Sequence, residues 1–233
     1  MNKRHLSTLA TNFAIILVLG ILFVSTVYGT ATTTAVKTDS AIYNGNRNGN
    51  KVSLMINVYW GTEYIEKMMD VFDDYGFKTT FFIGGRWAEK NGDLLKLMHE
   101  RGFEIANHGY LHRDASTLNE EQNRQEIIIT EKLIETITGT ATKLFAPPSG
   151  DLSKAMFKVA ENEGYKVIMW SKDTIDWRDK NSELVVQRAL KDLKGGDLIL
   201  MHPTEHTLKA LPEILEGIKQ ANLTCDTVSN VLG

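Results

Sequence analysis

The chain reads FEIANHGYLH at residues 103–112, a short apolar run followed by two histidines four residues apart. The run 103–106 is typical of a buried strand, so His108 and His112 follow directly after a strand end. Neutral imidazole is the commonest metal ligand in proteins. Histidines at this spacing also occur as solvated helix or loop residues. The stretch therefore indicates a β/α fold and raises the hypothesis of a metal site at its edge.

Short apolar runs alternate with helical patterns over the rest of the chain. We expect strands at residues 52–58, 79–83, 103–106, 143–145, 166–170, 197–201 and, weakly, 223–227. We expect helices at residues 62–75, 91–101, 118–138, 153–163, 181–193 and 205–221, the third opened by a capping box of Thr117 and Glu120. This alternation predicts an α/β fold with a parallel sheet. The periodicity leaves open whether the sheet closes into a barrel or stays an open, doubly wound sheet.

Composition excludes several classes of protein. The 233 residues are 42% hydrophobic and 24% charged, as in an ordinary globular protein. A net charge of -3 gives no reason to expect nucleic acid as a partner. No glycine-rich nucleotide-binding loop follows the first strand. The single cysteine, Cys225, rules out an internal disulfide and is expected to be an isolated buried thiol.

The N-terminal region has the pattern of a targeting segment. A basic start at residues 1–5 precedes an apolar run at residues 13–28, which is shorter than the roughly 20 residues of a bilayer-spanning helix. We predict that residues 1–31 are an export signal peptide, with an uncleaved membrane anchor as the alternative. Either would place the remaining chain outside the cytoplasm, secreted or anchored at the cell envelope. Residues 32–50 are predicted to be a flexible linker and residues 51–233 the globular domain.

Polar and rigid residues recur where the predicted strands end. They are Asn57 after the first strand, His108 and His112 after the third, Pro147 and Pro148 after the fourth, Asp173 and Asp176 after the fifth, and His202 after the sixth. Each has a structural explanation when taken alone, since a lone histidine is often hydrogen-bonded in place and aspartates often cap turns. In parallel α/β folds, however, functional groups collect at the carboxyl ends of the strands. We therefore expect these loops to form one site.

Residues 51–232 resemble the polysaccharide deacetylases of carbohydrate esterase family 4, which contain the NodB-type homology domain. The family's metal-binding motif, His-Ser/Thr-x-x-His, is matched by His108 and His112. A later motif is matched by residues 173–177. The resemblance implies that Asp173 supports the catalytic base and that Trp177 borders the acetyl pocket. A further motif is matched by residues 200–202. The resemblance implies a distorted (β/α) barrel of about seven parallel strands.

Two motifs depart from the family pattern. The family's Thr-Phe-Asp-Asp-Gly is replaced so that Asn57 stands where the catalytic base belongs and Val58 where a metal-binding aspartate belongs. The family's Arg-Pro-Pro-Tyr-Gly is replaced by residues 146–150, which lack the arginine. That arginine normally positions the base, so its loss is coherent with the loss of the base.

The resemblance implies roles for the remaining residues. His108 and His112 would hold a divalent metal, expected to be zinc, and His202 would be the general acid. The expected substrate pocket consists of Trp177, Leu200, Trp60, Pro147 and Pro148. A third metal ligand is missing, and the candidates are Asp151, Asp173, Asp176, Asp114 and Glu63. With Asn57 at the position of the base, the catalytic set is His202, Asn57 and Asp173.

Three functional hypotheses follow from this comparison. The first is metal-dependent hydrolysis of N-acetyl groups on an extracytoplasmic amino-sugar polymer, peptidoglycan- or chitin-like, which breaks a carbon–nitrogen bond other than a peptide bond. The second is a catalytically impaired relative that binds glycan or acts as a cell-wall scaffold. The third is a different amidohydrolase built on the same barrel. In the first two, the expected partner is an N-acetylated glycan, with the membrane as a further partner if the N-terminal segment is not cleaved.

Overall fold

The computed structural model describes residues 40–233. The predicted signal peptide or membrane anchor at residues 1–31 lies outside the described residues, as do residues 32–39 of the predicted linker. Among the helices of residues 40–233, none has the length and hydropathy that a bilayer crossing requires.

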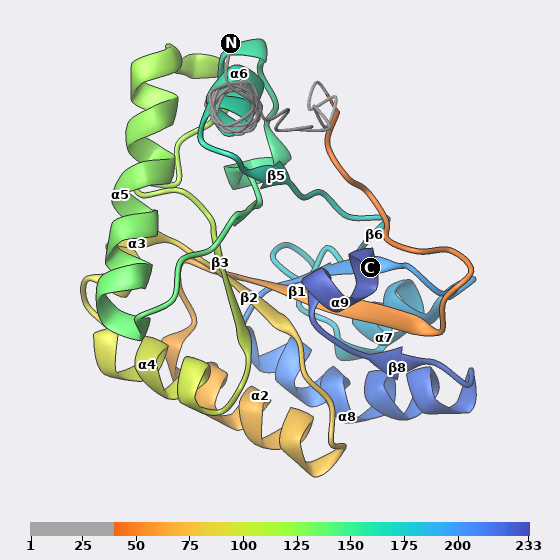
Figure 1. The fold of residues 1–233 in the computed structure, drawn as a ribbon. Helices are drawn as coiled ribbons and strands as arrows, with labels where there is room; N and C mark the ends of the chain where they lie inside the picture. Colours follow the sequence, from red (N-terminus) through yellow and green to blue (C-terminus); the bar gives the residue numbers. More distant parts are fainter. Residues whose placement is uncertain (1–39) are drawn as a thin grey trace, which may run out of the picture. The chain divides into compact units, whose positions relative to one another are not determined.

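The strands of the described region form one parallel sheet. They are β1 (Lys51–Val58), β2 (Thr80–Ile83), β3 (Glu104–Asn107), β4 (Leu144–Phe145), β5 (Lys166–Val167), β6 (Lys172–Asp173), β7 (Leu198–Met201) and β8 (Thr224–Cys225). Neighbours follow the order β5-β4-β3-β2-β1-β7-β6, and β8 pairs with the start of β1. The path curls into a half-barrel (Figure 1), which confirms the prediction of a distorted parallel barrel of about seven strands.

Helices pack around this sheet, most of them on its outer face, while the last one packs Val228 and Val231 in the cluster of the opposite face. They are α2 (Thr62–Asp74), α3 (Gly85–Ala88), α4 (Gly92–Glu100), α5 (Glu120–Thr138), α6 (Lys154–Asn162), α7 (Ser182–Leu190), α8 (Glu205–Gln220) and α9 (Val228–Leu232), with 3₁₀ turns η1 (Ala115–Thr117) and η2 (Pro148–Gly150). Helices α2 and α8 lie side by side in Figure 1, and α7 packs on α8. The buried residues of α2 fall on one helical stripe from Ile65 to Phe72.

The central strand β1 separates two apolar layers. Successive side chains of a strand point to opposite faces of the sheet. Val52, Leu54, Ile56 and Val58 therefore pack in the cluster that includes the outer helices. Met55 packs in a separate cluster on the other face. The same alternation places Asn57 on the inner face with Met55.

Several residues of the predicted linker, within residues 41–49, contact the sheet. Ile42 forms a parallel bridge to Ile168, and Asn44 forms an antiparallel bridge to Asp197. Arg47 forms an ion pair with Asp197 at 2.6 Å. Ile42 also packs against the cluster that contains Met55, but one isolated apolar side chain forms no periodic pattern that the sequence analysis could use.

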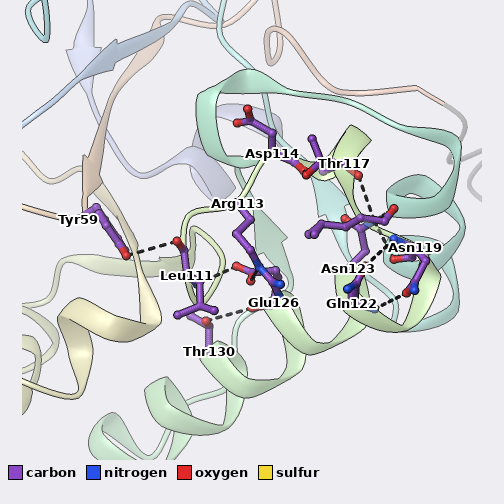
Figure 2. A network of polar contacts seen from close by, with 12 residues as sticks. Tyr59, Leu111, Arg113, Asp114, Thr117, Asn119, Gln122, Asn123, Glu126 and Thr130 are labelled. Atoms are coloured by element: carbon purple, nitrogen blue, oxygen red, sulfur yellow. Dashed lines mark hydrogen bonds and ion pairs between the residues drawn. The ribbon is translucent and has the colours of Figure 1, made fainter.

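Two local predictions also differ from the structure. The expected strand 166–170 is a regular strand only at residues 166–167, Ile168 forms only an isolated bridge, and a separate short strand β6 follows. Asn119, not Thr117, caps α5: its side chain accepts from the Gln122 amide, and the Gln122 side chain accepts from the Asn119 amide (Figure 2). Cys225 is buried and free, as predicted, and burial raises the pKa of its thiol to about 12.

Asp197 anchors residues 41–49 to the sheet. Its carboxylate accepts hydrogen bonds from Arg47, from Ser171 and from the Lys194 amide. Burial on its own would raise the pKa of Asp197, but these hydrogen bonds outweigh it and hold the pKa below its usual value. The ionised form is therefore the one that the fold stabilises.

We predict that Asp197→Asn lowers the free energy of unfolding at neutral pH by about 2 kcal/mol, because it removes charge-assisted hydrogen bonds at a buried position. Since the folded pKa is below the unfolded pKa, this stability is present above the unfolded pKa and is lost as pH falls through the folded pKa. Urea unfolding should thus show a gap between wild type and variant at pH 7 that narrows in acid. The exposed Asp74→Asn serves as control, and an equal effect of both substitutions would contradict the assignment.

Candidate functional site

A cavity of about 330 Å³ opens where the carboxyl ends of the strands meet. Its lining residues are Asn57, Tyr59, Trp60, His108, His112, Ser149, Gly150, Trp170, Asp173, Trp177, Leu200 and His202. It unites eight of the ten residues that the sequence predicted for the site. A second cavity, of about 370 Å³, lies near the amino ends of β3, β4 and β5. None of the ten predicted site residues lines it.

His108 is held in one protonation state at the end of β3. It is 1% exposed, and its Nδ1 lies 2.7 Å from the carbonyl oxygen of Ala146. A carbonyl only accepts hydrogen bonds, so Nδ1 carries the proton and Nε2 carries the free lone pair. Burial, reinforced by the neighbouring His112, lowers the pKa of His108 to about 3. His108 is therefore neutral at physiological pH, in the form that can act as a ligand or a hydrogen-bond acceptor.

His112 is brought to His108 by a loop that returns toward the sheet. The two ring centroids are 5.0 Å apart. The turn has positive φ at Gly109 (77°) and at His112 itself (56°). Burial lowers the pKa of His112 as well. The pairing that the sequence suggested is thus present in the structure.

Glu126 of α5 holds this loop and was not anticipated from the sequence. It is 3% exposed, and its carboxylate accepts from the Leu111 amide at 2.8 Å and from Arg113 Nε at 2.6 Å (Figure 2). Its position three residues after the buried Asn123 and four before the buried Thr130 puts it on the inward stripe of α5. A charged residue among buried positions of a helix is the sequence signal from which Glu126 could have been predicted.

Tyr59, not Val58, is the next residue after Asn57 to face the cavity. The Tyr59 ring centroid lies 4.8 Å from that of His112, and its hydroxyl donates to the Leu111 carbonyl oxygen at 3.3 Å (Figure 2). Val58 is fully buried in the layer between sheet and helices. The position that the family resemblance assigns to a metal-binding carboxylate therefore presents no polar side chain to the histidines.

The donor set beside the two histidines is incomplete. Within residues 40–233, no group of three His, Cys, Asp or Glu side chains could hold a metal ion. Of the five carboxylates considered as a third ligand, Asp173 lines the cavity, and it accepts from the Ile175 amide at 2.8 Å. Asp176 is bound to His202, and Asp151 accepts from the Ser116 amide. A catalytic zinc usually has three protein ligands and one open position, so these residues do not fit a resident zinc.

His202 is fixed by Asp176, which the sequence analysis named only as a residue at a strand end and as a candidate metal ligand. Asp176 is fully buried and accepts from His202 Nδ1 at 2.8 Å and from the His202 amide at 2.7 Å. Thr207 Oγ1 donates to the same carboxylate at 2.6 Å. Trp60 stacks on the His202 ring, with centroids 5.7 Å apart and planes 7° from parallel. The sequence motif contained both aspartates, and only three-dimensional structure distinguishes the one that holds His202.

Pro147 and Pro148 are buried and do not line the cavity, contrary to the expected substrate pocket. Pro148 lies against the turn at Gly109, where a side-chain Cβ would come within 3.2 Å of Pro148 Cγ. Ser149 and Gly150, which follow them, form the wall instead.

Aromatic side chains surround the polar centre. Trp177 is 54% exposed and Trp60 is 44% exposed, whereas Leu200 is nearly fully buried. Trp170 adds a further ring that the sequence did not indicate. An apolar pocket with exposed flat rings and a few fixed polar groups is suited to a small ligand group attached to a larger, partly apolar body.

Comparisons with known proteins agree with this geometry. The sequence profile of the family "Polysaccharide deacetylase" matches residues 44–168. The chain is 37% identical over 191 residues to the Bacillus subtilis protein YlxY, covering 82% of this chain and 60% of YlxY. It is 29% identical over 182 residues to a peptidoglycan-N-acetylglucosamine deacetylase of Bacillus cereus, covering 76% of this chain and 66% of that enzyme. The chain thus spans less than two thirds of the length of both relatives.

Solved structures give the same result. A carbohydrate esterase family 4 pseudoenzyme from Bacillus anthracis superposes with a TM-score of 0.81 at 32% identity, covering 83% of this chain and 69% of that one. A mutant of that pseudoenzyme is described as having restored enzymatic activity. Deacetylation of an N-acetyl sugar is hydrolysis of a carbon–nitrogen bond other than a peptide bond, so the hydrolase class expected from the sequence is that of the named deacetylases. Taken together, the profile, the relatives and the fold show that this chain belongs to the polysaccharide deacetylase family.

Proposed function

We propose that the domain binds an N-acetylated amino-sugar polymer of the cell envelope, peptidoglycan- or chitin-like, with little or no turnover. The observation that carries this proposal is Asn57, which lines the cavity where the family resemblance places the carboxylate base. An amide side chain cannot take a proton from water near neutral pH. The incomplete donor set around His108 and His112 supports the same proposal.

The preserved parts of the cavity favour glycan binding. Trp60 and Trp177 offer exposed rings on which a sugar could stack, and Leu200 offers a buried apolar surface for a methyl group. The named relatives support the ligand class, since one is a peptidoglycan-N-acetylglucosamine deacetylase and another is a pseudoenzyme of the same family. Residues 1–31 would bring the domain to this substrate as an export signal or a membrane anchor.

Metal-dependent N-deacetylation of the same polymer is the second candidate function. The observation that favours it is the retained histidine set, in which His202 is fixed by Asp176 and His108 keeps a free Nε2. A bound divalent metal would polarise the acetamide carbonyl and activate water. This function requires a further ligand and a base that the described residues do not place beside the histidines. No observation favours a different amidohydrolase.

We predict that the purified protein binds oligomers of N-acetylglucosamine and that Trp177→Ala weakens binding about tenfold, because an exposed stacking surface is lost. Isothermal titration calorimetry measures this affinity. The matched control is Tyr43→Ala, which removes an equally exposed ring outside the cavity and should leave binding unchanged. Absence of binding to both chitin and peptidoglycan oligomers would contradict the proposal.

The same preparations should release no more acetate from these oligomers than a His202→Ala variant does. Removal of general-base catalysis costs about 10²–10⁴-fold in rate, and the incomplete metal site lowers activity further. Acetate is measured by an enzyme-coupled assay in the presence of added zinc. Release well above the His202→Ala background would favour the second candidate over the first.

We predict that wild-type protein binds zinc weakly and that Asn57→Asp tightens the binding at least tenfold. The substitution places a carboxylate on the wall of the cavity that contains both histidines, and carboxylate oxygen is an established zinc ligand. Competition titration with a zinc chelator measures the affinity. His108→Ala in the Asn57→Asp background should abolish the gain. If the gain survives this second substitution, the zinc is bound elsewhere.

A further inference from the structure

The Asn57 side chain is buried, and its oxygen has no hydrogen-bond partner among the described residues. It is 4% exposed, and within residues 40–233 its Oδ1 has no partner. Most buried polar groups in folded proteins are hydrogen-bonded, and one left unpaired costs about 1–3 kcal/mol. Asn57 therefore lowers the stability of the ligand-free protein, and no hydrogen bond within the described residues offsets this loss.

Ser53 separates two explanations of this cost. Its hydroxyl is also buried and unpaired, and it lies on the same face of β1 as Asn57, four residues earlier. Ser53 does not line the cavity, whereas Asn57 does. An unpaired group inside the barrel can be a tolerated imperfection, but one on the cavity wall can be paired by a ligand.

We propose that the Asn57 side-chain amide pairs with the acetamido group of a bound sugar and makes the domain select N-acetylated over N-deacetylated units. This inference rests on the proposed glycan-binding function and specifies the group that is recognised. It makes Asn57 a determinant of specificity, not a remnant of a lost base.

The chemistry of the two amides is complementary. The Asn57 side chain offers one acceptor oxygen and an NH₂ donor, which exchange places on a half-turn of the terminal amide. An acetamido group offers one N–H donor and one carbonyl acceptor, so the two can bond in either orientation. An aspartate at this position could accept from the acetamide N–H but could not donate to its carbonyl.

A deacetylated sugar loses one of these partners, because its ammonium group can still donate to the Asn57 oxygen but offers no carbonyl to accept from the side-chain NH₂. Its ammonium group has donors only, carries a charge that must be desolvated in the cavity, and lacks the methyl group that would cover Leu200. Asp173, the carboxylate among the lining residues, already accepts from the Ile175 amide. Sites built to hydrogen-bond a polar group reject analogues that lack it, because the protein's own buried groups are then left unpaired.

The test compares Asn57→Leu with Ser53→Ala. Both substitutions remove a buried unpaired polar group from the inner face of β1, so both should leave the protein as stable as wild type or more stable in urea unfolding. Affinity for N-acetylglucosamine pentamer and for the glucosamine pentamer is measured by calorimetry, with EDTA present to exclude metal effects.

We expect wild type to prefer the acetylated pentamer at least tenfold, a difference that one satisfied buried hydrogen bond can supply. Asn57→Leu should lose at least tenfold in affinity for the acetylated pentamer and lose most of the preference. Ser53→Ala should retain both. Asn57→Ala gives the same readout if the leucine variant does not fold.

The outcomes distinguish this inference from the function on which it rests. If wild type binds neither pentamer, the glycan-binding proposal itself is overturned. If wild type binds the acetylated pentamer but Asn57→Leu binds it equally well, the role of Asn57 is overturned and the binding function stands. Equal losses in Ser53→Ala and Asn57→Leu would assign the effect to packing of β1 and overturn the recognition role.

Discussion

The parallel pairing of β1 on both of its edges is the constraint on which the rest of the structure depends. β1 pairs with β2 on one side and with β7 on the other, so the ends of these strands lie at one edge of the sheet. Because the strand alternates strictly, the same pairing sends Val58 toward the helices and Asn57 toward the barrel interior. A shift of one residue would exchange them, and the cost of burying an amide among helix side chains fixes the register.

Two buried carboxylates then arrange the histidines. Glu126 accepts two hydrogen bonds from the loop that carries His112, and Asp176 accepts two from His202. Each carboxylate is satisfied by donors within the protein, so the histidine positions do not depend on a bound metal for their geometry. This is the preorganisation that ligand binding requires, since the loops need not be ordered when the ligand arrives. The site can thus remain a defined cavity although its metal-ligand set is incomplete.

Sequence patterns identified those parts of the fold and site that depend on local regularities. The apolar runs located β1, β2, β3 and β7, and the strand-end rule gathered His108, His112 and His202 in one place. The segment 41–49 could not be found in this way, because its contacts come from isolated bridges, from Arg47 and from the single side chain of Ile42, which form no periodic pattern. Glu126 was missed because its contact with the loop joins residues that are distant in the sequence. Pro147 was misplaced because the sequence does not show which residues of a loop face the cavity.

Under the proposed function, binding and turnover separate within one fold. Stacking surfaces and an apolar pocket act through contact area, and they remain in Trp60, Trp177 and Leu200. The family's hydrolysis would additionally need a proton acceptor and a third metal ligand at fixed positions, and the family resemblance places both at two neighbouring positions of β1. An asparagine retained on the wall at a cost in stability is then best understood through what it can bind, because the fold alone gives no reason to keep an unpaired amide there.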